Sequence, residues 1–435
     1  MSKSLWLDYE FIDQPASQNP MERKTWCQLR IRIGDRFVSR VWDRSTKAER
    51  TTLYVPAFPI AEWLVSNWWF LWNEGQRPSD PWNWAQRHCF RAADAALLLP
   101  KLSVFHDGKC QRVQWEADPE GSRPHMPAEF CGGAGDEVLD ADQCRMTLSQ
   151  FIDDTLARVR DLGDDRVRDL HSLWQAIRSA GQDESDFCRL AGRFGVDPYN
   201  RKEMTDDLAT FLEKEFKTVD YPLVTDLIDV SHPQTISQQW EWITRTNAEL
   251  GMGPHRSESN VAIPVRGTSP PTFGYELART IRKVVGLSDE TPVDSVENLS
   301  RPILNKTFRV VDRNHLFGTG IKSLIGQTLS GEIISAGPHA LRADNRRFLV
   351  ARGLCHAIAN TRSSQRLVTE AFSWDQQASR AFAAELLIPQ EAIKNRISRS
   401  VADQSLIEVL ASEYVVSTLV VERQLQNMRI TISED

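Results

Sequence analysis

The stretch that decides the fold of the C-terminal part of the chain reads RRFLVARGLCH and occupies positions 346–356. It lies within a long helical pattern from Asn345 to Asn360, and a second helical pattern runs from Gln376 to Leu387. Pro389 ends the second pattern, because proline lacks the backbone N–H that a continuing helix needs. Strand-like segments precede this pair of helices, so we expect a domain that mixes helices with strands.

Four motifs, of which the last is a pair of helices, follow one another in an order that resembles the one in zinc metallopeptidase domains of the ImmA/IrrE type. FGYELARTIR (273–282) resembles the opening helix of those domains, and RRFLVA (346–351) resembles the approach to their zinc-binding helix. AFAAELLIP (381–389) is similar to their second signature helix. Their closing helices resemble LASEYVVS (410–417) and RQLQN (423–427). The resemblance implies a zincin-like helical and β fold from about Val265 onward.

In that family the zinc-binding helix carries the motif His-Glu-x-x-His. Residues four positions apart lie on one face of a helix, so two imidazoles can reach the same metal. The glutamate activates the water that the metal binds. An acidic residue of the second helix supplies the third ligand, which leaves one open position, as catalytic zinc requires.

The corresponding segment of this chain, RGLCH (352–356), keeps only the last residue of the motif, His356. Arg352 cannot bind zinc, because its guanidinium group stays protonated and has no lone pair to offer. Gly353 removes the general base. Cys355 points about 100° away from His356 around the helix, so it is a poor substitute ligand. The sequence therefore predicts that no metal is bound and that no peptide bond is cleaved.

The third ligand has two candidate positions. Asp375 is the nearest acidic residue ahead of the second signature helix, although Gln376 is an alternative for the same place. Our hypothesis is that Arg352 pairs with Asp375, so that an ion pair fills the place of the metal. The alternative is a zinc site rebuilt around His356, with further ligands chosen from Asp375, Glu370 and His339.

Composition limits the classes of protein to be considered. The net charge of −7 gives no general attraction to nucleic acids. The seven cysteines are widely spaced and form no Cys-x-x-Cys pair, which is typical of a protein from a reducing cytoplasm. The most apolar stretch, Ala57 to Trp72, is shorter than the roughly 20 residues that a membrane span needs, so we expect a buried helix there. The N-terminus has no apolar signal core.

The 435 residues predict two or three domains. Residues 1–160 contain ten of the fourteen tryptophans and are expected to form an α+β domain. Residues 161–250 read as a helical spacer, and residues 265–435 as the peptidase-like domain. The predicted class is therefore a multidomain α+β protein.

Two further features have a functional and a structural interpretation. The tryptophans at 63, 68, 69 and 72 could line an aromatic groove for a protein partner, but a helix packed in the core is favoured. Helix pairs around Gly195 and around 414–417 imitate a helix-turn-helix motif. The helical pattern at 202–217 carries five acidic residues, which would repel DNA, so core packing is favoured there too.

The resemblance implies a regulatory setting, because active members of the family cleave helix-turn-helix repressors that control mobile elements or stress genes. We expect a non-catalytic member that binds a protein partner, such as a repressor or an antitoxin-like protein. Two alternatives stay open. An active zinc endopeptidase predicts bound zinc and cleavage of a repressor, and a DNA-binding regulator predicts salt-dependent affinity for DNA.

Overall fold

The computed structural model describes residues 2–12, 17–77, 80–119, 121, 124–215, 221–253, 259–313, 320–338, 342–359, 365–397 and 401–433. The chain divides into two compact units, Met1–Leu212 and Glu213–Asp435. Their boundary falls inside the region that the sequence predicted as a helical spacer, so its first helices belong to one unit and its last helices to the other. The protein is 49% helical and 20% strand, which confirms the predicted α+β class.

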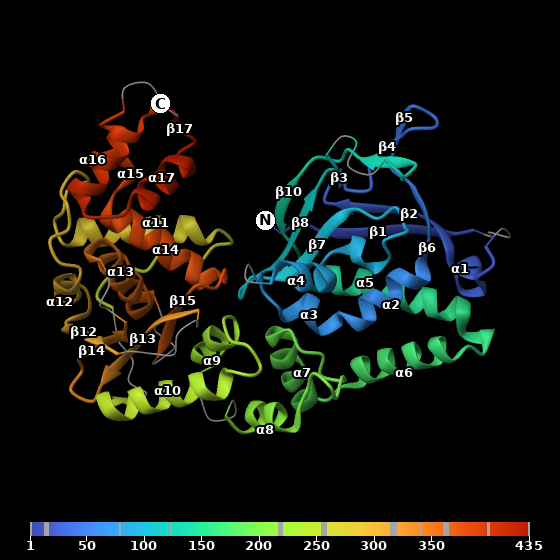
Figure 1. The fold of residues 1–435 in the computed structure, drawn as a ribbon, viewed down its shortest axis with the longest axis horizontal. Coiled ribbons are helices and arrows are strands. Elements are labelled where there is room, and N and C mark those ends of the chain that lie inside the picture. The colour runs from blue at the N-terminus through green and yellow to red at the C-terminus, as the bar shows by residue number, and fades with distance from the viewer. Residues whose placement is uncertain are drawn as a thin grey trace. The chain divides into compact units, whose positions relative to one another are not determined.

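The strands of the first unit form three antiparallel sheets (Figure 1). One sheet has the order β1-β2-β3, and β6 also pairs with β2; the second has the order β10-β8-β7 and the third β5-β4-β9. The strands are β1 (Leu5–Phe11), β2 (Trp26–Ile33), β3 (Arg36–Phe37), β4 (Val41–Asp43), β5 (Ala48–Arg50), β6 (Leu53–Pro56), β7 (Lys101–His106), β8 (Gln111–Glu116), β9 (Ala128–Phe130) and β10 (Gly135–Val138).

Helices fill the rest of the first unit, and α5 packs against β1 through an edge-to-face contact of Tyr9 with Phe151. Asp140 begins α5 by accepting a hydrogen bond from the backbone N–H of Gln143, as an N-cap residue does. The helices are α1 (Pro20–Thr25), α2 (Ala57–Ser66), α3 (Trp68–Asn73), α4 (Pro81–His88), α5 (Ala141–Val159), α6 (Asp165–Ser179), α7 (Gln182–Phe194) and α8 (Asp206–Glu215, which crosses the unit boundary).

The apolar stretch from Ala57 to Trp72 is not one helix but two, because the chain leaves helical geometry at Asn67 between α2 and α3. Trp63, Trp68 and Trp72 are at most 7% exposed, and Trp69 packs partly buried against the same core. The interpretation of these tryptophans as core residues is therefore confirmed.

A buried carboxylate joins the end of α3 to α4 in the first unit. Glu74 is fully buried and accepts hydrogen bonds from Arg87 at 2.8 and 2.6 Å, with Arg77 at 3.0 Å and His88 Nε2 at 3.0 Å. Burial alone would raise the pKa of Glu74, but its hydrogen bonds with His88 and Arg87 outweigh that effect and lower the pKa to about 2. Glu74 is thus ionised at neutral pH and holds three cationic or basic side chains together.

The second unit is built on a mixed five-stranded sheet with the order β11-β13-β14-β12, in which β15 pairs with β13. The pair β12 and β14 is parallel, whereas β13 runs antiparallel to β14 and β15. The strands are β11 (Met252–Gly253), β12 (Phe308–Asp312), β13 (Ile321–Thr328), β14 (Ile333–Gly337) and β15 (Arg366–Thr369), and a separate parallel pair is β16 (Val401–Ala402) with β17 (Thr431–Ile432).

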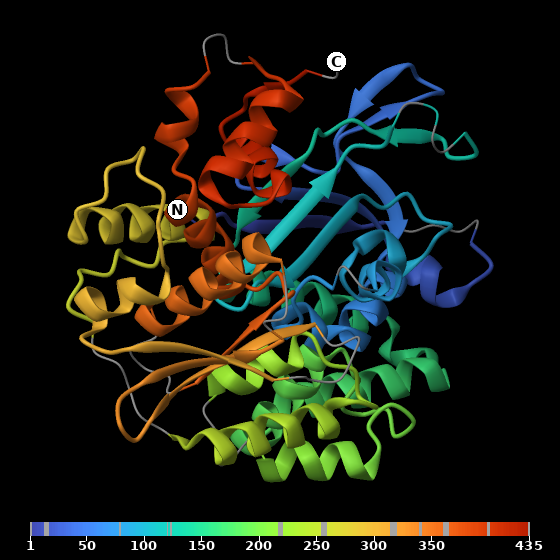
Figure 2. The same cartoon turned by 60° about the vertical axis from the view of Figure 1, so that its left-hand side comes forward.

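Helices cover both sides of this sheet, with α13 and α14 on one side and α10 on the other (Figures 1 and 2). The helices are α9 (Tyr221–Ile228), α10 (Ile236–Leu250), α11 (Pro270–Val284), α12 (Ser300–Leu304), α13 (Ala343–Ala359), α14 (Trp374–Leu387), α15 (Gln390–Lys394), α16 (Gln404–Tyr414) and α17 (Thr418–Asn427). Among the described residues no single helix is long and apolar enough to cross a membrane; by length and composition alone, the bent pair α16 and α17 meets that test together.

The packing of α11 against α14 depends on Gly274. A Cβ atom at this position would lie 2.4 Å from the carbonyl oxygen of Ala378 and 2.7 Å from the backbone nitrogen of Phe382. Both atoms belong to the backbone of α14 and cannot move aside, so only glycine allows the two helices to approach so closely. This contact holds α14 in the position from which it meets α13.

Candidate functional site

The residues that the sequence predicted in place of the family's metal-binding motif lie on the buried face of α13. Arg352 and His356 are four positions apart, so they share one helix face, and they are only 6% and 3% exposed. Gly353 is also buried, and a Cβ atom there would lie 2.8 Å from Cδ1 of Ile325 on β13. The space beside Gly353 is therefore occupied by the sheet.

The guanidinium group of Arg352 is held by neutral oxygen atoms. Its Nη2 donates to Oε1 of Gln376 and to the carbonyl oxygen of Thr369, each at 2.8 Å, and its Nε donates to Oγ of Ser379 at 3.1 Å. Burial, and then the nearby charge of Arg380, lower the pKa of Arg352 well below its ordinary value. Through these hydrogen bonds Arg352 connects its own helix, α13, to α14 and to β15.

The expected ion pair of Arg352 with Asp375 is wrong. No carboxylate of a described residue lies within 4.0 Å of Arg352. Asp375 instead pairs with Nη2 of Arg366 at 2.9 Å and with Arg266, whose guanidinium also lies 4.5 Å from the ring centroid of Trp374. The physical reason is position on α14: Gln376, the alternative named for this place, is fully buried and faces Arg352, whereas Asp375 is 28% exposed.

A buried acid, Asp226 of α9, completes the site, and the sequence alone did not single it out. Asp226 is 2% exposed and accepts two hydrogen bonds from Arg366, at 2.6 and 2.9 Å, and one from Nε2 of Gln376 at 3.1 Å. One signal could have found it. The surrounding sequence, LVTDLI (223–228), is otherwise almost entirely apolar, and a charged residue in such a helix needs a buried partner.

Side chains occupy the outer edge of β15. The N–H of Leu367 donates to Asp226 at 3.1 Å, and its carbonyl oxygen accepts from Gln376 at 2.7 Å. The N–H of Thr369 donates to Gln376 at 3.0 Å, and its carbonyl oxygen accepts from Arg352 at 2.8 Å and from Arg380 at 3.3 Å. These four groups are the ones that an added peptide strand would need, since β15 pairs with β13 on its other edge.

Residues 315–426 match the family model of the IrrE N-terminal-like domain, peptidase family M78. This part of the chain is an IrrE N-terminal-like domain. The match covers α13, α14 and the sheet strands β13 to β15, which carry Arg352, Arg366 and Gln376, but it does not include α9, which carries Asp226. No curated protein matches the chain.

The donor set of this IrrE N-terminal-like domain does not fit the zinc ion that its family implies. At the first motif position a guanidinium group donates hydrogen bonds where a metal would need a lone pair. Among the described residues no three His, Cys, Asp or Glu side chains are grouped as metal ligands would be. Cys355 is buried, and burial raises the pKa of its thiol to about 12.

The residues named for a rebuilt zinc site do not converge on His356. Glu370 points elsewhere: its side chain is 63% exposed and pairs with Lys322 at 2.5 Å. Asp375 is engaged by Arg366 and Arg266, and His339 lies outside the described residues. His356 itself is buried, and burial, with the charges of Arg366 and Arg352, lowers its pKa well below the ordinary value.

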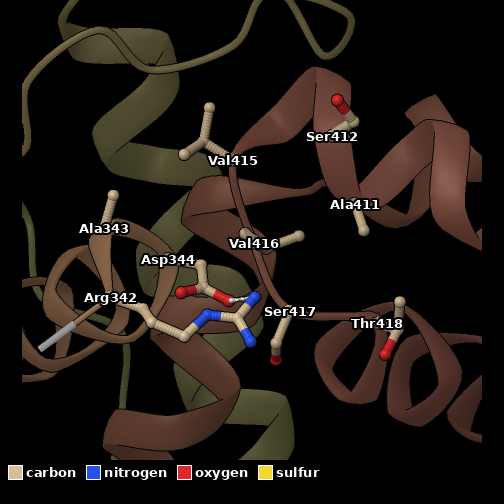
Figure 3. Close-up of a pocket in the computed structure, with 9 residues that line it drawn as sticks. All are labelled: Arg342, Ala343, Asp344, Ala411, Ser412, Val415, Val416, Ser417 and Thr418. Carbon is tan, nitrogen blue, oxygen red and sulfur yellow. Dashed lines mark ion pairs between the residues drawn. The ribbon is translucent and has the colours of Figure 1, made fainter.

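A surface pocket of about 610 Å³ lies on the same domain, where the start of α13 faces the turn between α16 and α17 (Figure 3). Its ionisable lining is Arg342 paired with Asp344 at 3.3 Å, and the rest is small or apolar. The two helices meet at 114°, but α17 carries Glu422 beside Arg423 rather than a basic surface. Without a basic surface, this helix pair offers little attraction to DNA phosphates.

Proposed function

We propose that the C-terminal domain is a non-catalytic member of its family that binds a protein partner in a regulatory setting. The observation that carries this proposal is the position of Arg352. Its buried guanidinium group is fixed by three hydrogen bonds in the place where the family motif has its first zinc ligand. A cation would be repelled there, and replacing a metal ligand by a fixed positive charge removes the basis of metal-assisted hydrolysis.

The occupied edge of β15 supports the same proposal. An extended peptide substrate commonly binds by adding a strand to an exposed sheet edge. Here Leu367 and Thr369 already have their outward N–H and C=O groups bonded to side chains of α9, α13 and α14. A peptide could pair with this edge only after breaking those bonds, so binding of a substrate for cleavage is disfavoured along with the chemistry.

The proposed partner is a protein, and a helix-turn-helix repressor or an antitoxin-like protein suits the regulatory setting that the family implies. A cytoplasmic setting fits the cysteine usage of the sequence. An active zinc endopeptidase is the competing proposal, and it requires both that zinc binds and that a repressor is cut.

Metal content separates these proposals. The full chain, free of tags and purified without chelators, is analysed for zinc by mass spectrometry, and then titrated with zinc against a chromogenic chelator. We expect a zinc-to-protein ratio near zero and no competition with the chelator. A ratio near one that falls in His356→Ala would contradict the proposal, whereas loosely bound zinc that survives His356→Ala belongs to another part of the chain.

A further inference from the structure

Two arginines at the altered site, Arg352 (buried) and Arg380 (partly buried), have no carboxylate partner among the described residues. Arg352 comes from α13 and Arg380 from α14, and both donate to one oxygen atom, the carbonyl of Thr369, at 2.8 and 3.3 Å. Arg380 also donates to the carbonyl oxygen of Ala371 at 2.8 Å. The two guanidinium groups are therefore close neighbours, and burial lowers the pKa of both.

The carboxylates nearby are already used by other cations. Asp226 is engaged by Arg366, Asp375 by Arg366 and Arg266, and Glu370 by Lys322. Carbonyl, amide and hydroxyl oxygens accept hydrogen bonds from Arg352 and Arg380, but these neutral atoms do not balance two positive charges. A buried charge without a counter-charge costs several kcal/mol, which is why buried charges are generally paired.

Two donors on one face of α13 have no acceptor among the described residues. Nη1 of Arg352 has no described acceptor, because the hydrogen bonds of this side chain start from Nε and Nη2. His356 follows Arg352 by one helical turn on the same face, and its Nε2 is buried without a hydrogen-bond partner in the described part of the chain. In the neutral imidazole Nε2 can carry the proton and act as a donor.

Arg380 is the more accessible of the two arginines. This side chain is only partly buried and lies 5.3 Å from the ring centroid of Phe372, which is 44% exposed. A ligand that approaches beside Phe372 meets Arg380 first and Arg352 behind it.

We propose that Arg352 and Arg380, with Nε2 of His356 beside them, bind one oxyanion, a carboxylate or a phosphate group, at the place where the family binds a cation. The inference rests on the proposed loss of the metal site and adds a ligand class to it. Planar guanidinium groups match the paired oxygens of such anions, and hydrogen bonds between ionised groups are the strong ones. The anion has two sources, free phosphate or an acidic group of the partner protein.

The test measures the melting temperature and the heat of binding of the full chain at constant ionic strength. Inorganic phosphate, acetate and an acidic tetrapeptide are each titrated in place of chloride. We expect a saturable rise in melting temperature with at least one of them. Saturation with phosphate alone identifies a free anion, and saturation with the peptide at lower concentration than with acetate identifies the side chain of a partner.

Variants assign the effect to the site. Arg380→Gln, at the more accessible arginine, is expected to weaken binding at least tenfold. Arg396→Gln is the matched control, since Arg396 is half exposed and pairs with Glu413 at 2.8 Å elsewhere on the domain. Arg352→Lys keeps the positive charge but loses the planar guanidinium group that can donate two parallel hydrogen bonds, so we expect weaker binding. Circular dichroism checks that this variant keeps its fold.

The proposal is overturned if none of the three anions gives a saturable response, or if Arg380→Gln responds like the wild type. The proposed function would fail in a different way. Zinc would then be bound, and the His356→Ala substitution would remove it.

Discussion

Oε1 of Gln376 accepts a hydrogen bond from Arg352 at 2.8 Å, and this contact fixes the orientation of the whole Gln376 amide. With Oε1 turned toward Arg352, Nε2 donates to Asp226 at 3.1 Å and to the carbonyl oxygen of Leu367 at 2.7 Å. The amide thus presents an acceptor to a cation and donors to an anion. A carboxylate at this position could do the first but not the second.

Gln376→Glu is therefore expected to destabilise the second unit. The new carboxylate would face both Asp226 and the carbonyl oxygen of Leu367, and its ion pair with Arg352 would offset only part of that repulsion. We expect a loss of about 1–2 kcal/mol in the free energy of unfolding at pH 8. Burial beside Asp226 raises the pKa of the introduced acid, so the loss should shrink as the pH falls and the acid takes up a proton.

A double-mutant cycle isolates the contact. Asp226→Asn turns the acceptor into a side chain that can donate, so Asp226→Asn combined with Gln376→Glu should recover at least about 1 kcal/mol relative to the sum of the single changes. Urea denaturation at pH 8 measures all four proteins. Additive single changes would show that the two side chains do not interact as described.

Gly353→Glu restores the residue type of the family motif but should not be tolerated. The side chain would enter space that Ile325 and Phe308 occupy, and a buried carboxylate in apolar surroundings costs about 3 kcal/mol or more. Gly353→Ala is the matched control. Its gain of about 1 kcal/mol in helix propensity should roughly balance the displacement of the flexible end of Ile325. Equal stability of the Glu and Ala variants in urea would contradict this account.

Gly274→Ala is expected to lower the free energy of unfolding by about 1–3 kcal/mol, because the added methyl group collides with the backbone of α14. Gly267→Ala provides the comparison, since nothing lies within 4 Å of a Cβ atom at that position. Urea denaturation followed by tryptophan fluorescence measures both. A loss of the same size in both variants would point to a general effect of replacing glycine.

Glu74 makes the stability of the first unit depend on pH. The pKa of Glu74 is about 2 in the folded protein, compared with 4.5 for an unperturbed glutamate. Its contribution to the free energy of unfolding is therefore present above pH 4.5 and is lost as the pH falls toward 2. The shift corresponds to about 3 kcal/mol. Glu74→Gln should flatten the dependence of stability on pH in this range. Glu116→Gln, at an exposed glutamate paired with Lys101, should leave the dependence as it is in the wild type.

The sequence predicted the helices and strands of the second unit better than their side-chain partners. The helical patterns at 345–360 and 376–387 correspond closely to α13 and α14, because apolar residues recur on one face of each helix. The choice between Asp375 and Gln376 could not be made from spacing. These residues are neighbours on α14, and a difference of about 100° in direction decides which one faces Arg352.

Asp226 could not be placed by sequence for a different reason. Its partners Arg366 and Gln376 lie more than a hundred residues further along the chain, and no local pattern states which acid meets which arginine. The end of α2 at Asn67 could not be predicted either. The apolar residues on both sides of Asn67 are buried, so the composition of this stretch does not distinguish one helix from two.

The hydrogen bonds of Asp226 also determine where the protein can be divided. A fragment that begins at residue 315, where the family match starts, or at 265 lacks α9 and deprives Arg366, Leu367 and Gln376 of one shared acceptor. Such a fragment would leave the N–H of Leu367 and the buried guanidinium group of Arg366 without this acceptor, so we expect it to be less stable than the full chain. A fragment intended to fold as this domain should therefore begin before Tyr221, so that it includes α9.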